Sequence, residues 1–421
     1  MSTDATHWDR TDRYDVVVVG GGQSGAQFAV ALRALGFKGS IGILCAECDP
    51  PYERPPLCKE YLAGGKPFEH LLFRSDQEWR TLGVNILFGE RACSIDPTAH
   101  RVTANSGRSY GYSKLVWAAG GSARTLNCAG ANAAGIHSIR SRADVDSIRI
   151  ELPDAKNVVV VGGGYIGLES AAVIAQSGKR VCVVEALDRV LARVAGEPLS
   201  RFYEVEHRAR GVEIRLGRRV SAIEESKGRC ARVCLDDGTL LPAELVVVGV
   251  GMSPEVEALV VAGAVAERGV RVNAHCQTSI EDVYAIGDCV EQQSIYARGE
   301  WVSVESVHNA NQQAMIAARA ICGLPFLPST IPWFWSNQYD LRLQTVGLSQ
   351  IYDDLVVRGD PATRSFSLIY LHDGKVAAID SVNAVRDYSH ARFVIAADTK
   401  VDRSRLADPT VPLKSIAQAG S

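Results

Sequence analysis

The strongest constraint on the fold of this chain is an internal repeat of a valine-rich segment followed by a glycine-rich turn. The run YDVVVVGGGQSGAQFAVAL begins at Tyr14, and KNVVVVGGGYIGLESAAVI begins at Lys156. Four consecutive valines predict a strand buried on both faces, as in a parallel sheet, and an apolar helix is predicted after each turn. The later runs IGILCAE and RVCVVEA supply the next parallel strand of each unit. The sequence therefore predicts an α/β protein with two Rossmann-type domains.

The first repeat has the residue spacing of a dinucleotide-binding turn. Gly20, Gly22 and Gly25 form the pattern GxGxxG between a strand and a helix, and Glu47 is expected to close the second strand. Glycines at these positions allow a tight turn, the close approach of a pyrophosphate and the packing of helix against strand. We expect Glu47 to accept a hydrogen bond from an adenosine ribose hydroxyl.

The second repeat has the same pattern and ends its second strand on Glu185. A carboxylate at this position favours a free ribose 2′-hydroxyl and repels a 2′-phosphate, so NADH is predicted rather than NADPH. Arg189 and Arg193 lie close enough in sequence to form a phosphate clamp, which keeps NADPH open as an alternative. Two dinucleotide sites in one chain indicate an electron path, with FAD on the first turn and NADH on the second. The glycines of the second turn are Gly162, Gly164 and Gly167.

Composition excludes several other classes of protein. The formal net charge of -3 and a pI near 6.3 give no electrostatic support to a nucleic-acid partner. No stretch is apolar for long enough to span a bilayer, and the first thirteen residues lack the apolar middle of a secretory signal, so no membrane association and a cytoplasmic location are expected.

The eleven cysteines are spread singly and indicate reduced thiols, not a disulfide framework. Cys45 and Cys48 form a CxxC that could be a redox dithiol, but Cys45 lies within a predicted buried strand. Cys230 and Cys234 lie on the same side of a predicted strand without a second pair of metal-type ligands. Both pairs are interpreted as core residues, and no metal site is predicted.

The remaining segments predict the domain boundaries. Residues 14–125 and 254–330 are expected to form a discontinuous FAD-binding domain, because the strand VYAIGD from Val283 can return to the first sheet. Residues 126–253 are assigned to an NAD-binding domain. From Ile331 the sequence becomes aromatic-rich and alternates with a period of two, which predicts a C-terminal α+β domain over 331–421. Residues 1–13 are predicted to be a disordered tail.

Six further segments resemble one known family. The sequence is similar to the FAD-dependent NADH:ferredoxin reductases of bacterial oxygenase systems, which are putidaredoxin-reductase-like members of the glutathione-reductase superfamily. The segments are PYERPPLCKEYL from Pro51, KLVWAAGGSAR from Lys114, GGGYIGLESAA from Gly162, TSIEDVYAIGDC from Thr278, ESVHNANQQA from Glu305 and PWFWSNQYDLRLQTVG from Pro332. The resemblance implies a glutathione-reductase-like fold with bound FAD and NADH as the substrate.

The resemblance also implies which residues act. Lys59 is placed near the isoalloxazine N5 and paired with Glu169, where an ammonium stabilises negative charge on the reduced flavin. Glu169 has a rival interpretation as a first-turn carboxylate favoured by the helix dipole. Asp288 is placed at the flavin ribityl chain, although a plain Gly-Asp turn is the alternative. Trp335 is placed near the flavin ring as an electron exit, although an aromatic side chain here is equally compatible with a core role.

Other positions complete the sites that the resemblance implies. The residues Glu305, Ser306 and Val307 are placed at a helix start beside the flavin pyrimidine edge. The further FAD-binding candidates are Arg54, Ala119, Gly120 and Arg124. The further NAD-binding candidates are Tyr165, Ile166, Arg193 and Gly251.

The sequence departs from the family pattern at four positions: Cys58 replaces a serine, Ala119 a threonine, Ser303 an arginine and Asn337 an aspartate. Cys58 next to Lys59 raises the alternative of a catalytic thiol, because a nearby cation lowers a thiol pKa. No resolving cysteine lies beside it, and a near-isosteric substitution is the favoured interpretation.

The expected function is that of an NADH-dependent ferredoxin reductase. FAD accepts hydride from NADH and passes single electrons to a 2Fe-2S ferredoxin that serves a ring-hydroxylating dioxygenase or a haem monooxygenase. The alternatives are an NADH oxidase or peroxide reductase, and a redox-controlled binding protein of the apoptosis-inducing type. A monomer or homodimer is expected, and an acidic ferredoxin would dock on a basic rim for which the candidates are Arg342, Arg386 and Arg392.

Overall fold

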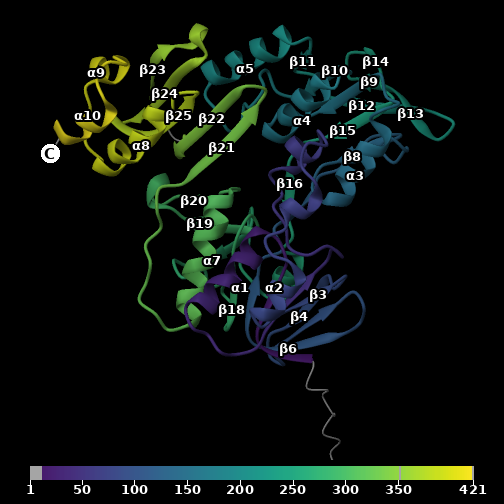
Figure 1. Cartoon of the computed structure of the whole chain (residues 1–421), viewed down its shortest axis with the longest axis vertical. Helices are drawn as coiled ribbons and strands as arrows, with labels where there is room; N and C mark the ends of the chain where they lie inside the picture. Colours follow the sequence, from purple (N-terminus) through teal and green to yellow (C-terminus); the bar gives the residue numbers. More distant parts are fainter. Residues whose placement is uncertain (1–11, 350–351, 420–421) are drawn as a thin grey trace, which may run out of the picture. The chain divides into compact units, whose positions relative to one another are not determined.

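The computed structural model describes residues 12–349 and 352–419 and divides the chain into two compact units (Figure 1). Unit 1 comprises Met1–Glu53, Leu71–Gly121 and Pro254–Thr330, and unit 2 comprises Arg54–His70, Ser122–Ser253 and Ile331–Ser421. The predicted tail over 1–13 lies outside the described residues as far as residue 11. The predicted boundary is wrong at residue 13, because Arg13 is the first residue of strand β1 (Arg13–Val19).

Unit 1 is built on a sheet whose strand order is β3-β2-β1-β6-β5-β4, with β18 paired to β6. The pairs β3-β2, β2-β1, β1-β6 and β6-β18 are parallel, whereas β4-β5 and β5-β6 are antiparallel. The segment around VYAIGD therefore returns to the first sheet. The strands are β2 (Ile41–Cys45), β3 (Val84–Phe88), β4 (Ala92–Asp96), β5 (Arg101–Ala104), β6 (Ser109–Trp117) and β18 (Val283–Ala285).

The alternating valines of β1 divide the core of unit 1 into two layers. Val16 and Val18 pack with helices α1 (Gln23–Ala34) and α7 (Val307–Ile321), which lie side by side (Figure 1). Val17 and Val19 contribute to the second layer, on the opposite side of the sheet. A strand covered on both faces explains why β1 ends in four consecutive valines. The smaller elements of this unit are α2 (Asp76–Thr81), α6 (Glu257–Val261) and a sheet of β17 (Val270–Val272), β19 (Val290–Gln293) and β20 (Trp301–Val302).

Unit 2 repeats this plan with the parallel sheet β11-β10-β9-β15-β8. Its strands are β8 (Ile136–Ser138), β9 (Asn157–Val161), β10 (Arg180–Glu185), β11 (Glu213–Leu216) and β15 (Leu245–Val248). The helices are α3 (Arg142–Glu151), α4 (Tyr165–Gln176) and α5 (Glu197–Ala209). An antiparallel sheet of β12 (Val220–Ser226), β13 (Arg229–Leu235) and β14 (Leu240–Pro242) packs on it. Two short strands, β7 (Gly121–Ala123) and β16 (Met252–Pro254), stand at the chain boundaries between the units.

The C-terminal part of unit 2 is an antiparallel sheet in the order β21-β22-β25-β24-β23 (Figure 1). The buried guanidinium of Arg358 donates to the Asp387 carboxylate at 3.0 Å and to the carbonyl oxygens of Leu406 and Val411, which ties the last helices to this sheet. The elements are β21 (Trp333–Gln338), β22 (Leu341–Gly347), β23 (Asp354–Asp360), β24 (Ser365–His372), β25 (Lys375–Val382), α8 (Val385–Ala397), α9 (Arg403–Ala407) and α10 (Leu413–Ala419).

The predicted α/β class, with two Rossmann-type sheets and a C-terminal α+β part, is confirmed. The longest helix in the described part of the chain, α7, has 15 residues, and none of the described helices combines the length and hydrophobicity that a membrane span requires.

Candidate functional site

The glycine turn of unit 1 is fixed by close backbone packing. Gly20 has φ +107°, and a Cβ added there would lie 2.3 Å from the carbonyl oxygen of Ala118. A Cβ on Gly25 would lie 2.0 Å from the carbonyl oxygen of Gly20. A Cβ on Gly287, which has φ +84°, would lie 2.5 Å from the Ser24 hydroxyl. The start of α1 is therefore held tightly against both β1 and the turn after β18.

The turn of unit 2 has the same packing and one informative difference. Gly162 has φ +105°, and a Cβ on Gly167 would lie 2.0 Å from the carbonyl oxygen of Gly162. Gly164 has φ −78°, which any residue can adopt, and a Cβ there would meet no protein atom within 4 Å. Because neither conformation nor packing requires glycine at 164, the missing side chain leaves open space at the start of α4. This space fits the approach of a ligand.

The N-termini of α1 and α4 both leave backbone donors without a side-chain cap. Neither helix has an N-cap side-chain hydrogen bond or an acidic residue in its first turn. In contrast, Ser141 caps α3, and the hydroxyl of Ser306 accepts from the Asn309 N–H at 3.1 Å to cap α7. Uncapped N–H groups at the positive end of a helix dipole bind anions. Both turns thus fit the pyrophosphate of a dinucleotide.

The acidic residues after the two turns are held differently. Glu47 lies two residues beyond the end of β2 and accepts from the hydroxyl of Tyr52 at 2.6 Å. Glu185 is the last residue of β10, and its two carboxylate oxygens accept from the N–H groups of Gly163 at 2.6 Å and Leu187 at 2.8 Å. These backbone bonds fix the orientation of Glu185 beside the glycine turn.

The two arginines considered as a phosphate clamp have separate environments. The guanidinium of Arg189 donates to the carbonyl oxygens of Ala192 and Ala195 and to the Ser200 hydroxyl, so it is used inside its own loop. Arg193 is exposed in the same loop. Arg189 is therefore not available as half of a clamp without breaking these bonds.

Lys59 and Glu169 form a buried ion pair within unit 2. Lys59 lies in the short helical segment Leu57–Tyr61, whose regular geometry it interrupts with φ −124° and ψ −112°. Its Nζ lies 2.5 Å from Glu169 Oε2 and donates to the carbonyl oxygen of Pro55 at 3.0 Å. The side chains are 12% and 4% exposed. The interpretation of Lys59 as a surface residue is therefore wrong. The interpretation of Glu169 as a first-turn carboxylate is wrong as well, because Glu169 lies beyond the first turn of α4.

Cys58 completes this cluster as a thiol. Its Sγ donates to Glu169 Oε2 at 3.0 Å. Burial and the negative charge of Glu169 raise the pKa of Cys58 far above its ordinary value, which disfavours the thiolate that a catalytic thiol requires. Burial lowers the pKa of Lys59, but the charge and hydrogen bond of Glu169 oppose this effect and the pKa is raised overall, so the ammonium form is retained. The geometry favours the near-isosteric interpretation of Cys58.

Ser336 binds the other oxygen of the same carboxylate. Its hydroxyl donates to Glu169 Oε1 at 2.7 Å and is fully buried. Ser336 is not among the predicted site residues, although it lies within the segment PWFWSNQYDLRLQTVG from Pro332. No spacing rule could identify it, because the contact joins residues that are 167 positions apart in the chain.

Trp335 lies on the opposite face of β21 from Ser336, since side chains alternate along a strand. It packs beside Trp333, with ring centroids 5.5 Å apart, and is half-buried. Phe334, not Trp335, contacts Tyr165 at the start of α4, at a centroid separation of 4.7 Å. The aromatic run thus covers both faces of this strand.

The other candidate residues are distributed over both units. In unit 1, Ala119 and Gly120 follow β6 beside Gly20, Asp288 is half-buried after Gly287, Glu305 is exposed, and Val307 begins α7. In unit 2, Arg54 donates to the carbonyl oxygen of Arg140 at 2.5 Å, the N–H of Arg124 donates to the carbonyl oxygen of Gly251 at 3.0 Å, and Ile166 is exposed.

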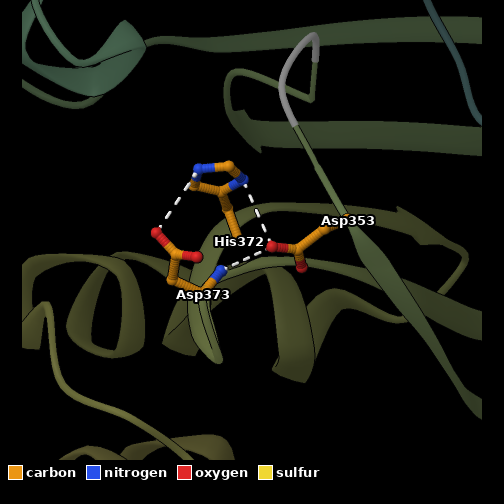
Figure 2. A group of neighbouring side chains, drawn as sticks. All are labelled: Asp353, His372 and Asp373. Atoms are coloured by element: carbon orange, nitrogen blue, oxygen red, sulfur yellow. Dashed lines mark hydrogen bonds and ion pairs between the residues drawn. The ribbon is translucent and has the colours of Figure 1, made fainter.

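A separate group of polar side chains lies at the hairpin between β24 and β25 (Figure 2). The carboxylate of Asp353 accepts from the N–H of Asp373 at 2.8 Å and lies 3.4 Å from His372 Nδ1. Asp373 and Gly374 have φ +51° and +76°, as a two-residue hairpin turn requires. These contacts account for the group as a turn that is held to Asp353, the residue that precedes β23.

The cysteines and the proposed basic rim can also be placed. All eleven cysteines are free thiols. Cys45 is buried at the end of β2, where its Sγ would lie 2.3 Å from a Cβ on Gly21, so it packs beneath the first glycine turn. The candidate arginines of the rim, Arg342, Arg386 and Arg392, are all exposed.

Comparison with known proteins agrees with this geometry. Residues 14–314 match the model of the pyridine nucleotide-disulphide oxidoreductase family, and residues 333–417 match the reductase C-terminal family. The chain is 51% identical to the 5,5'-dehydrodivanillate O-demethylase ferredoxin reductase subunit of Sphingobium sp., over 96% of this chain and 99% of that protein. It is 38% identical to putidaredoxin reductase of Pseudomonas putida, over 96% and 97% of the two chains.

A solved structure of a covalent putidaredoxin reductase-putidaredoxin complex has a similar chain. The TM-score is 0.93 at 37% identity, and the alignment covers 98% of this chain and 99% of that one. Together with the two glycine turns and their uncapped helices, this similarity identifies the class of enzyme. The chain belongs to the FAD-dependent ferredoxin reductases within the pyridine nucleotide-disulphide oxidoreductase family.

Proposed function

We propose that this enzyme is an NADH-dependent reductase of a 2Fe-2S ferredoxin that serves an oxygenase acting on aromatic compounds. The names of its relatives support this proposal, because they include a ferredoxin reductase subunit of an O-demethylase and putidaredoxin reductase. Bound FAD supplies the conversion between the two electrons of a hydride and the single electrons that a ferredoxin accepts. The chain binds and orients the two dinucleotides.

The observation that carries the NADH assignment is the fixed carboxylate of Glu185. Two backbone N–H groups hold it at the end of β10, where it can accept from a ribose 2′-hydroxyl and repels a 2′-phosphate. Arg189 is used within its loop, which leaves the exposed Arg193 as the nearby cation considered for a 2′-phosphate. We expect kcat/KM to be at least tenfold higher with NADH than with NADPH.

The test compares electron acceptors as well as donors. Purified enzyme with bound FAD is assayed with NADH or NADPH, first with oxygen alone and then with a 2Fe-2S ferredoxin. Rapid turnover only in the presence of ferredoxin supports the proposal. Equal rates with oxygen alone would indicate an NADH oxidase, and equal kcat/KM for NADPH would remove the role of Glu185.

For the chemical step we propose that Lys59 and Glu169 act as an electrostatic pair. The buried ammonium stabilises negative charge on the reduced flavin, and Glu169 fixes the position of that ammonium. Replacement of Lys59 with Met is expected to slow flavin reduction by NADH at least tenfold in stopped flow. Lys66→Met, at another lysine of the same segment, is the matched control. An unchanged rate in Lys59→Met would exclude this role.

The remaining assignments are part of the same proposal. We propose the division into an FAD-binding domain (14–125 and 254–330), an NAD-binding domain (126–253) and a C-terminal domain (331–421). The roles of Asp288 at the ribityl chain, of Ser306 at the pyrimidine edge and of Trp335 in electron exit are proposed likewise. The exposed arginines of the rim would contact an acidic ferredoxin. Eleven free thiols support a cytoplasmic location for this activity.

A further inference from the structure

A chain of hydrogen bonds leads away from the Lys59–Glu169 pair through the interior of unit 2. The hydroxyl of Ser336 donates to Glu169 Oε1 at 2.7 Å, and the side-chain amide of Gln338 donates to Ser336 Oγ at 3.2 Å. Gln338 Oε1 lies 2.8 Å from Nε2 of His207. The hydroxyl of Tyr339 lies 3.3 Å from Nδ1 of the same imidazole. Four side chains from β21, α5 and the β21–β22 turn therefore form one connected network.

The donors of this network all point in one direction. Gln338 uses its NH₂ group toward Ser336, so its oxygen must accept from His207, which therefore carries its proton on Nε2. A neutral imidazole protonated on Nε2 accepts at Nδ1, where the Tyr339 hydroxyl donates. Burial and the positive charge of Arg210 lower the pKa of His207 to about 4, against the opposite effects of the Gln338 hydrogen bond and of Glu206, so the imidazole is neutral near pH 7. Every bond in the series thus delivers a donor toward Glu169.

Burial of these side chains makes the loss of any one hydrogen bond in the network costly. The side chains of Ser336, Gln338 and His207 are buried, with at most 1% exposure, so water cannot replace a lost partner. Tyr339 has φ +56°, a conformation that is unfavourable for a bulky residue. An unfavourable backbone at the end of a fully paired buried network indicates that the placement of this hydroxyl is maintained by its surroundings.

We propose that Ser336, Gln338 and His207 are positioning residues. They hold the Glu169 carboxylate in one orientation and limit how strongly it accepts a hydrogen bond from the Lys59 ammonium. The proposal rests on the role of the Lys59–Glu169 pair in the proposed function. Glu169 receives donors on both oxygens, from Ser336 on Oε1 and from Lys59 and Cys58 on Oε2. When the donor on Oε1 is lost, the carboxylate accepts more strongly from the two donors on Oε2. The ammonium then stabilises a reduced flavin less effectively.

The network does not serve as a proton wire. A side-chain amide donates through nitrogen and accepts through oxygen, and it does not pass a proton from one to the other as a hydroxyl or imidazole does. Gln338 therefore interrupts proton movement between His207 and Ser336 while it still transmits orientation. The function that fits this arrangement is control of geometry and charge at Glu169.

Cys58 provides a spectroscopic probe that does not depend on the flavin. Its S–H group donates to the same carboxylate, so the S–H stretching frequency reports how strongly Glu169 accepts. The experiment uses the full-length enzyme with bound FAD and compares wild type with Ser336→Ala, Gln338→Glu and the hydroxyl-retaining control Ser336→Thr. The band is assigned from its loss in Cys58→Ser. FAD content and thermal melting verify that each variant is folded.

The expected result is a lower S–H frequency in Ser336→Ala, because Glu169 then accepts more strongly from Cys58. Gln338→Glu should give the same shift, since a carboxylate at 338 accepts from the Ser336 hydroxyl and withdraws that donor from Glu169. Ser336→Thr should leave the band in place. In the two shifted variants the equilibrium constant for flavin reduction should fall about tenfold, which corresponds to about 30 mV for a two-electron couple.

An unchanged S–H band in both Ser336→Ala and Gln338→Glu would overturn the proposal. A shifted band with an unchanged potential, while Lys59→Met does change the potential, would overturn the connection from Glu169 to the flavin. If Lys59→Met changes neither the rate nor the potential, the proposed role of Lys59 fails. The band shifts then still decide whether the network positions Glu169.

Discussion

The two glycine turns of this enzyme have nearly the same backbone and different chemistry. Gly20 and Gly162 have φ values of +107° and +105°, and a Cβ on either Gly25 or Gly167 would lie 2.0 Å from the carbonyl oxygen of the first glycine of its own turn. Both helices begin without a side-chain cap. The repeated part is therefore the geometry that fits a pyrophosphate.

The difference appears one turn into each helix. Five residues after Gly22, α1 carries Gln27, whereas five residues after Gly164, α4 carries Glu169. Gln27 is only half-buried, but Glu169 is buried and contacts Lys59, Cys58 and Ser336. The two repeats therefore differ at one matched helix position, where unit 2 has a buried carboxylate with three side-chain partners.

The largest expected effect tests the shared backbone. Gly167→Ala places a Cβ against the carbonyl oxygen of Gly162, and Gly25→Ala does the same in the first turn, so each should lower the free energy of unfolding by about 4 kcal/mol. Gly164→Ala is the control for packing, since its Cβ meets open space, and it should cost no more than about 1 kcal/mol, which reflects the lower preference for Ala at the N-cap of α4. Denaturant unfolding measures these values.

The same control separates folding from binding. Gly164→Ala should weaken NADH binding about tenfold, or about 1.4 kcal/mol, because its methyl group occupies the space that a pyrophosphate would approach. Isothermal titration with NADH measures this change. Wild-type affinity in Gly164→Ala would show that the open space is not the binding site.

The next effect tests the point at which the two repeats diverge. Glu169→Gln leaves the buried ammonium of Lys59 without its charged partner and should cost about 3 kcal/mol of stability. Gln27→Glu, the reverse exchange at the matching helix position of unit 1, should cost less than about 0.5 kcal/mol because that side chain is partly exposed. Thermal melting of the two variants gives the comparison. Equal costs would mean that burial of the pair contributes nothing.

The sequence allowed the prediction of the two glycine turns that the units share. It did not by itself reveal the buried contacts of Glu169, by which the two units differ. Valine runs and glycine spacing depend on local geometry, so they identified both sheets and both turns. The pairing of Lys59 with Glu169 came from family resemblance, since the two residues are 110 positions apart. Ser336, Gln338 and His207 have no local signature, because their contacts exist only after α4, α5 and β21 have packed together.

The aromatic strand shows a second limit of pattern analysis. In WFWSNQ, large aromatic residues occupy both faces, so a period of two cannot show which of them faces α4. The structure places Phe334 and Ser336 on that face and Trp335 on the other. The second strand of unit 1 is a similar case, since its sequence did not reveal that β2 ends at Cys45, two residues before Glu47.

The third prediction concerns His207, which lies on α5 of unit 2. Buried His207 has a pKa lowered from 6.5 to about 4, so the unfolded chain binds a proton at this residue between these pH values and the folded chain does not. Its contribution to stability is complete above pH 6.5 and is lost as the pH falls toward 4, by about 3 kcal/mol. Chemical denaturation over pH 4–7.5 should show this loss in wild type and not in His207→Gln.

The difference between these two proteins is the quantity to measure. Burial raises the pKa of Asp380 to about 6, which changes stability in the opposite direction over the same pH range and is common to both proteins. Parallel pH profiles in wild type and His207→Gln would contradict a neutral, buried imidazole at position 207.

The smallest effect concerns the acidic residues that follow the two turns. Glu185→Gln keeps the side-chain shape but removes the charge that repels a 2′-phosphate, and it should lower the ratio of kcat/KM for NADH to that for NADPH about tenfold, or about 1.4 kcal/mol. Glu47→Gln changes the equivalent residue after the first turn. It should leave this ratio unchanged, because Glu47 lies in unit 1, where its carboxylate accepts from the hydroxyl of Tyr52. Since both variants remove one carboxylate, a similar loss of selectivity in the two would mean that net charge, and not the position of Glu185 beside Gly163, selects the nucleotide.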